Sequence, residues 1–187
     1  MRSEAFLVSD PICHTAPRCI LTGMTTSPAL RTLRAEIDIA AAPDEVWATL
    51  TNLARMPDWS PELLRMVPLK PGGLRVGQWY LGVNKRGPVV WPTRNVVTDL
   101  RPKSLLAWNT PTSGARWIWS LEPMTPSADP AAGMTRVTVE RPMHSIPPLA
   151  RLTTKTLLGG VEGHADELDD GIRITLRRFK AAVEQSS

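Results

Sequence analysis

Residues 37–47 read IDIAAAPDEVW, and a second tryptophan follows in the triplet WSP at residues 59–61. The first stretch predicts a strand that gives way to a helix, because Pro43 suits the first turn of a helix. The two acidic residues after Pro43 favour the positive end of the helix dipole. Val46 and Leu50 are four residues apart and give this helix one apolar side. The stretch therefore predicts a strand, a short connection and an amphipathic helix.

The residues on either side extend this pattern. Residues 33–39 alternate apolar and charged side chains, and this period of two predicts a strand with one buried face. Leu53 continues the apolar side of the helix beyond Leu50, and Pro57 limits a second helical turn. The sequence thus predicts two short helices between the first strand and the WSP triplet.

The middle of the chain changes to short apolar segments separated by turn-forming residues. Such spacing is typical of an antiparallel sheet. Pro92 lies inside the third segment and indicates a sheet edge or a bulge there, since proline has no amide hydrogen. The predicted strands are residues 64–69, 76–83, 89–100, 105–109, 115–122 and 135–141.

The end of the chain carries the longest helical pattern. Its apolar residues are spaced by three or four positions over more than 20 residues, which predicts one continuous buried helix face. Apolar residues from Leu149 onward leave an earlier start open, with Gly159 and Gly160 marking either a boundary between two helices or a weak point in one. The residues of this face are Val161, Ala165, Leu168, Ile172, Leu176, Phe179 and Val183.

The composition indicates one ordinary folded domain. The chain has 187 residues and a net charge of +4, and its basic residues are dispersed, so we expect no nucleic-acid partner. No apolar run reaches the 18 residues of a membrane-spanning helix. We expect a disordered extension over residues 1–30, a domain over residues 31–187, and a monomer or homodimer.

The N-terminal segment differs from the rest because it lacks periodicity. Its apolar run is too short for a secretory signal. Cys13, His14 and Cys19 follow no familiar zinc spacing, so we expect no metal site. The organised pattern begins just after Met24, which suggests Met24 as the natural start. The domain would then contain no cysteine, which suits a cytoplasmic protein.

In order and spacing, these segments resemble those of the SRPBCC superfamily, the START-like helix-grip proteins, and within it the polyketide cyclase/dehydrase-like branch. The resemblance covers roughly residues 33–183. It implies an α+β helix-grip fold, in which a curved antiparallel sheet wraps around a long C-terminal helix. It also implies a cavity between the sheet and that helix. The matching segments are IDI at 37–39, APDEVW at 42–47, WSP at 59–61, LRVG at 74–77, WSLEP at 119–123 and TRVT at 135–138.

Seven tryptophans stand beside only one tyrosine and two phenylalanines. An indole has a large apolar surface and one N–H donor, which suits a flat or greasy ligand, although a single tryptophan more often fills a core. Residues two apart on a strand share a face, so Trp117 and Trp119 lie together. In a fold expected to be hollow, we predict that the cavity is lined by Trp59, Trp79, Trp91, Trp117, Trp119, Leu168, Ile172 and Leu176.

The sequence contains no motif that fixes catalytic residues. His144 follows a strand, and His164 lies beside the apolar face of the last helix, where a solvated histidine is the simpler interpretation. We expect no cofactor, since no phosphate-binding or dinucleotide-binding motif is present. The leading hypothesis is binding of a hydrophobic or aromatic small molecule, lipid-like or polyketide-like. The alternatives are a polyketide cyclase/dehydrase-type enzyme and a stress-regulatory or interaction module without a small ligand.

Overall fold

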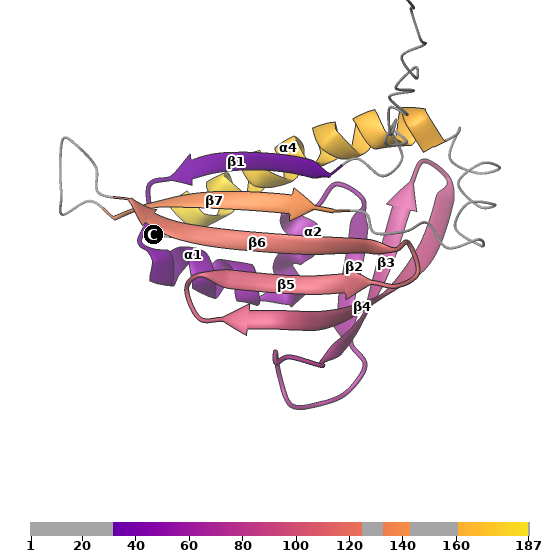
Figure 1. Cartoon of the computed structure of the whole chain (residues 1–187), viewed down its shortest axis with the longest axis horizontal. Helices are drawn as coiled ribbons and strands as arrows, with labels where there is room; N and C mark the ends of the chain where they lie inside the picture. Colours follow the sequence, from indigo (N-terminus) through magenta and orange to yellow (C-terminus); the bar gives the residue numbers. More distant parts are fainter. Residues whose placement is uncertain (1–31, 125–132, 143–160, 187) are drawn as a thin grey trace, which may run out of the picture.

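The computed structural model describes residues 32–124, 133–142 and 161–186, with side chains in the last helix described from residue 169 onward. Two short helices and a 3-10 turn follow the first strand, six further strands come next, and a long helix ends the chain (Figure 1). The elements are β1 (Leu33–Ile39), α1 (Pro43–Thr51), η2 (Leu53–Arg55), α2 (Met56–Trp59), β2 (Leu63–Pro68), β3 (Trp79–Arg86), β4 (Val89–Arg101), β5 (Leu105–Thr110), β6 (Ala115–Met124), β7 (Met134–Arg141) and α4 (Val161–Glu184).

The start of α1 forms as its sequence predicts. Pro43 occupies the first turn, where its missing amide hydrogen removes no helical hydrogen bond. The side chain of Glu45 turns back and accepts a hydrogen bond from the backbone N–H of Ala42 at 3.1 Å. Val46 and Leu50 are fully buried, so the predicted apolar side of the helix faces the core.

The strands form one antiparallel sheet of seven in the order β1-β7-β6-β5-β4-β3-β2. The sheet curves, and the helices lie on its concave side (Figure 1). Pro92 is paired with Val83 of β3, whereas the pairing of β4 with β5 begins only at Val96. The first half of β4 therefore has one neighbouring strand, and this local edge accommodates the proline.

Helix α4 lies across β1 and packs against α2 (Figure 1). Its predicted apolar face is buried through Ile172, Leu176, Phe179 and Val183. Its last turns also attach to the end of β1, because Lys180 Nζ donates to the Asp38 carbonyl at 2.6 Å. This attachment fixes the position of the helix relative to the sheet.

At the centre of the core, aromatic rings from α2, α4 and the sheet pack against one another. Phe179 of α4 meets Trp59 of α2 and Trp119 of β6 edge-on, with ring centroids 5.2 Å and 5.3 Å apart. Such edge-to-face geometry is favourable between aromatic rings. Three elements distant in sequence are thereby held together at one end of the space between sheet and helix.

The predicted helix-grip architecture is confirmed, including the two short helices after the first strand. The predicted strand boundaries differ by up to three residues, most for the strand predicted over residues 76–83, which spans Trp79–Arg86. Gly77 precedes it with φ of +79°, a left-handed conformation that interrupts an extended strand. The predicted extension over residues 1–30 and the helix start near Leu149 lie outside the described residues.

Candidate functional site

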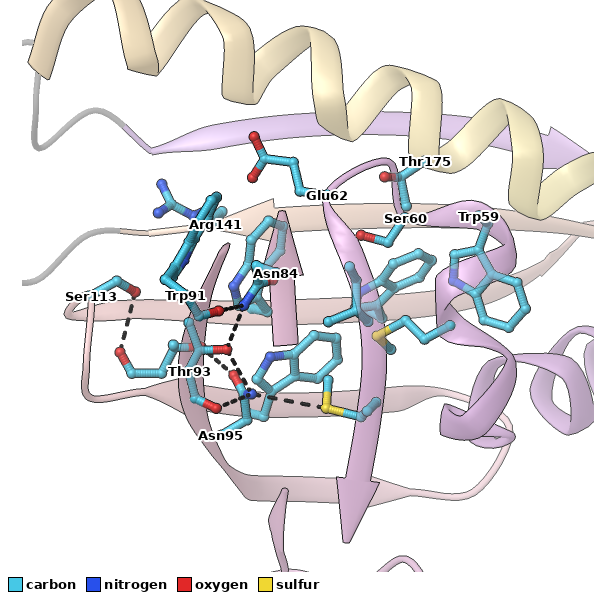
Figure 2. Close-up of a pocket in the computed structure, with 17 residues that line it drawn as sticks. Trp59, Ser60, Glu62, Asn84, Trp91, Thr93, Asn95, Ser113, Arg141 and Thr175 are labelled. Atoms are coloured by element: carbon cyan, nitrogen blue, oxygen red, sulfur yellow. Dashed lines mark hydrogen bonds between the residues drawn. The ribbon is translucent and has the colours of Figure 1, made fainter. Parts of the chain in front are cut away.

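A pocket opens between the concave face of the sheet, the end of α2 and helix α4 (Figure 2). Its volume is about 170 Å³, and its apolar lining is mostly indole. Alternation along the strands brings these side chains together, because every second residue of a strand faces the same side. The tryptophans that line the pocket are Trp59, Trp91, Trp108, Trp117 and Trp119.

Trp108 and Trp117 form the flat wall of this pocket. They are directly opposite each other in the pairing of β5 with β6. Their rings stack with centroids 6.3 Å apart and an angle of 21° between the planes. Trp119, two residues further along β6, continues the same face and is 3% exposed. The wall therefore offers flat apolar surface held rigid by cross-strand packing.

A row of amides and hydroxyls lines the side of the pocket away from α4 (Figure 2). Asn84 donates to Thr93 Oγ1 at 3.0 Å, and Asn95 donates to the same oxygen at 3.3 Å. The Thr110 hydroxyl donates to Asn95 Oδ1 at 2.8 Å. Because Asn95 and Thr110 are buried, these bonds fix the orientation of polar groups that could meet a ligand.

Two charged side chains, Arg141 and Glu62, lie on the side nearer α4 (Figure 2). Arg141 ends β7 and is only 9% exposed. Its guanidinium carbon lies 5.3 Å from the centroid of the Trp117 ring, within range of a cation–π interaction. Its Nε has no hydrogen-bond partner among the described residues.

Burial changes the protonation of both charged groups. It lowers the pKa of Arg141 to about 10, an effect that the charge of Glu62 partly opposes. It raises the pKa of the Glu62 carboxyl, while the positive charges of Arg86 and Arg141 act in the opposite direction. At neutral pH the guanidinium is still charged, so the pocket contains a poorly solvated cation.

A second space of about 340 Å³ adjoins the pocket along α4. Gly171, Ile172 and Ile174 of the helix line it. Together the two spaces run from the tryptophan wall to the inner side of the helix. The residues that line both are Ser60, Glu62, Asn84, Trp117 and Thr175.

The structure brings most of the predicted cavity residues to these two spaces. Trp59, Trp91, Trp117 and Trp119 line the first, and Ile172 lines the second. Leu176 is fully buried in the core and lines neither space. The side chain of Leu168, like that of His164, lies outside the described residues, as do His144 and the Cys13–Cys19 segment.

Trp79 is not where the sequence suggested. It lines neither space, because on β3 it is out of phase with the inward-facing Tyr80, Gly82 and Asn84. The outer set of Trp79, Leu81 and Val83 is apolar, whereas the inner set combines the buried Tyr80 with Gly82 and Asn84. Alternation alone therefore does not show which set faces inward, and of the inner set Asn84 belongs to the polar row.

Sequence reasoning also missed pocket residues, among them Trp108, Glu62 and Arg141. A signal for Arg141 was present, because it is in phase with Val137 and Val139 on the apolar face of β7. Trp108 gave a weaker signal, since β5 is apolar on both faces and alternation does not distinguish them.

Within the described ranges, no group of three or more His, Cys, Asp or Glu side chains is placed to hold a metal ion. None of the described helices combines the length and the hydrophobicity that a membrane crossing requires.

The fold and this pocket define a helix-grip protein with an internal site, and the comparisons identify its family. Residues 31–184 match the family model for polyketide cyclase/dehydrase and lipid transport proteins. The chain belongs to this family. No curated protein sequence matches it.

Solved structures show the same fold. The Polyketide_cyc-like protein Cgl2372 from Corynebacterium glutamicum is 24% identical, with a TM-score of 0.57 over 82% of this chain and 91% of its own. Protein NE0264 from Nitrosomonas europaea is 17% identical, with a TM-score of 0.57 over 83% of this chain and 95% of its own. Protein MLL2253 from Mesorhizobium loti is 15% identical, with a TM-score of 0.56 over 84% of this chain and 99% of its own.

Proposed function

We propose that this protein binds a hydrophobic or aromatic small molecule in the pocket between the sheet and α4. The observation that supports this most strongly is the convergence of five tryptophans from four elements on one space. A core filled only for stability would not surround an opening with its largest side chains. The family description, which includes lipid transport, agrees with an apolar ligand.

The size and chemistry of the site favour a small ligand with a few polar groups. The tryptophan-lined pocket alone, at about 170 Å³, is smaller than the usual small-molecule pocket of about 300–1,000 Å³, and the adjoining space of about 340 Å³ brings the site into that range. The tryptophan wall supplies apolar contact, and the row from Asn84 to Thr110 supplies fixed donors and acceptors. A lipid-like or polyketide-like molecule combines both features.

The neutral dye N-phenyl-1-naphthylamine tests this proposal, because its fluorescence rises when it enters an apolar site. The full chain should bind it saturably. Trp91→Leu should weaken binding by about fivefold to thirtyfold, the effect of losing part of an indole contact surface. Trp79→Leu is the matched control, since Trp79 is also a half-buried strand tryptophan but lies on the opposite face. Equal losses in both variants, or no saturable binding by the wild-type chain, would contradict the proposal.

A further inference from the structure

We propose that the ligand of this pocket carries an anionic oxygen group, such as a carboxylate, which pairs with Arg141. This inference rests on the proposed function and specifies the class of ligand. It follows from the position of Arg141, which is 9% exposed and reaches the pocket from the end of β7.

The other described arginines that form ion pairs lie at the surface or are only partly buried. Arg136 pairs with Asp38 at 2.8 Å, and Arg34 pairs with Glu140 at 3.0 Å. Arg141 is more buried than either, yet no carboxylate of the described residues forms an ion pair or hydrogen bond with its guanidinium. A buried charge without a partner is costly, and such charges in proteins are paired or bind something.

The surroundings of Arg141 favour one kind of hydrogen-bond acceptor for its Nε–H. The ring of Trp117 lies under the guanidinium, whose carbon is 5.3 Å from the ring centroid. A guanidinium is planar and presents its N–H groups as a fork that matches the two oxygens of a carboxylate. The same ring also lines the pocket, so a ligand resting on the tryptophan wall has its acidic end beside Arg141.

Glu62 favours a ligand with one anionic group over a ligand with two. It is the carboxylate that lines the pocket among the described residues, and its charge acts on Arg141 from a distance longer than an ion pair. It offsets part of the positive charge in the empty pocket and repels any second anionic group of a ligand. Removing its charge should therefore strengthen the attraction of Arg141 for an anion.

Two dyes with the same aromatic frame separate this inference from the proposed function. N-phenyl-1-naphthylamine is neutral, and 8-anilinonaphthalene-1-sulfonate adds one sulfonate to the same two ring systems. Arg141→Met keeps a side chain of similar length and replaces the charged guanidinium by an uncharged, apolar group. It should weaken binding of the sulfonate dye by about tenfold to hundredfold, the effect of losing charged hydrogen bonds. Binding of the neutral dye, which has no acidic group, should weaken by a factor at least about fivefold smaller than that for the sulfonate dye.

Arg136→Met is the matched control, because Arg136 lies on the same strand and alternation places it on the opposite face. It should leave both affinities within about twofold. If Arg141→Met weakens both dyes equally, or neither, the inference is wrong although dye binding by the wild-type chain still supports the proposed function. Failure of the wild-type chain to bind the neutral dye would instead contradict the proposed function.

Glu62→Gln gives an independent result that does not depend on the folding of an Arg141 variant. It should tighten binding of the sulfonate dye by about threefold or more relative to binding of the neutral dye, because it removes a nearby negative charge. Unchanged or weaker binding of the sulfonate dye relative to the neutral dye in Glu62→Gln would overturn the inference.

Discussion

Arg141 sits on the apolar face of β7, in phase with Val137 and Val139. Burial lowers its pKa to about 10, so holding it charged in the fold costs on the order of 3 kcal/mol. At neutral pH the folded chain carries this cost, which begins to fall only as the pH rises through the lowered pKa. A site that binds an anion explains why such a residue stands in a strand core.

Arg141→Met should therefore stabilise the empty protein at neutral pH. We expect the free energy of unfolding to rise by about 1–2 kcal/mol, less than the full cost because the contact with Trp117 is also lost. Urea unfolding followed by tryptophan fluorescence measures this change. A loss of more than about 1 kcal/mol would show that Arg141 supports the fold itself.

Glu62 should make the stability of the folded chain depend on pH. Burial raises its pKa above the usual 4.5, so the folded chain binds this proton more tightly than the unfolded chain. The stability that Glu62 contributes is present below pH 4.5 and is lost as the pH rises through the raised value.

Glu62→Gln lacks this titration. The free energy of unfolding of the variant relative to the wild-type chain should therefore increase from about pH 4 to about pH 7 and then level off. Urea unfolding at a series of pH values measures the difference. A difference that stays constant over this range would contradict the raised pKa.

Among the elements, β3 is the strand whose backbone lies close against the polar side chains of the pocket. Gly82 lies on its inner face, and a Cβ added there would lie 2.6 Å from Thr93 Oγ1 and 3.1 Å from Asn95 Nδ2. Those atoms belong to the polar row and are held by hydrogen bonds to each other. Glycine is required here because any side chain would displace the row.

Gly82→Ala should destabilise the protein by about 1–2 kcal/mol, since the Thr93 hydroxyl must move and its hydrogen bonds weaken. Gly171→Ala is the contrasting variant, because a Cβ at this position in α4 would meet nothing within 4 Å. It should stabilise the protein by about 0.5–1 kcal/mol through higher helix propensity. Thermal and urea unfolding of both variants measure the two signs. A stable Gly82→Ala variant would show that the polar row is not held in place as described.

Elements with one strong period were predictable from the sequence. The spacing of apolar residues predicted α4, and Pro43 with the acidic residues after it predicted the start of α1. Strand boundaries depended on turn residues, and the left-handed Gly77 moved the start of β3 from residue 76 to residue 79. The spacing of apolar residues predicts strand boundaries less well where a glycine adopts a backbone conformation that other residues avoid.

At the scale of the whole molecule, the hollow between sheet and helix was predictable but its chemistry was not. Alternation correctly placed Trp117 and Trp119 on one face. It misplaced Trp79, because β3 turns Tyr80, Gly82 and Asn84 inward. The lining departs from the usual pattern only in part, since β6 turns tryptophans toward the pocket while β3 and β4 turn Asn84, Thr93 and Asn95 toward it.

The most direct test of the account uses the tryptophans as reporters. The chain contains seven, each with one indole N–H that gives its own signal in a ¹⁵N-labelled NMR spectrum. Five line the pocket, and the other two, Trp47 on α1 and Trp79 on the outer face of β3, serve as internal controls. Each signal is assigned by single substitution of its tryptophan.

Titration with N-phenyl-1-naphthylamine should shift or broaden the indole signals of the stacked pair Trp108 and Trp117 and of the half-buried Trp91, and leave those of Trp47 and Trp79 unchanged. Trp59 and Trp119 should show smaller shifts, because both are almost fully buried and pack edge-on against Phe179. Shifts confined to Trp47 and Trp79, or no shift in any indole signal at saturating dye, would contradict a ligand site between the sheet and α4.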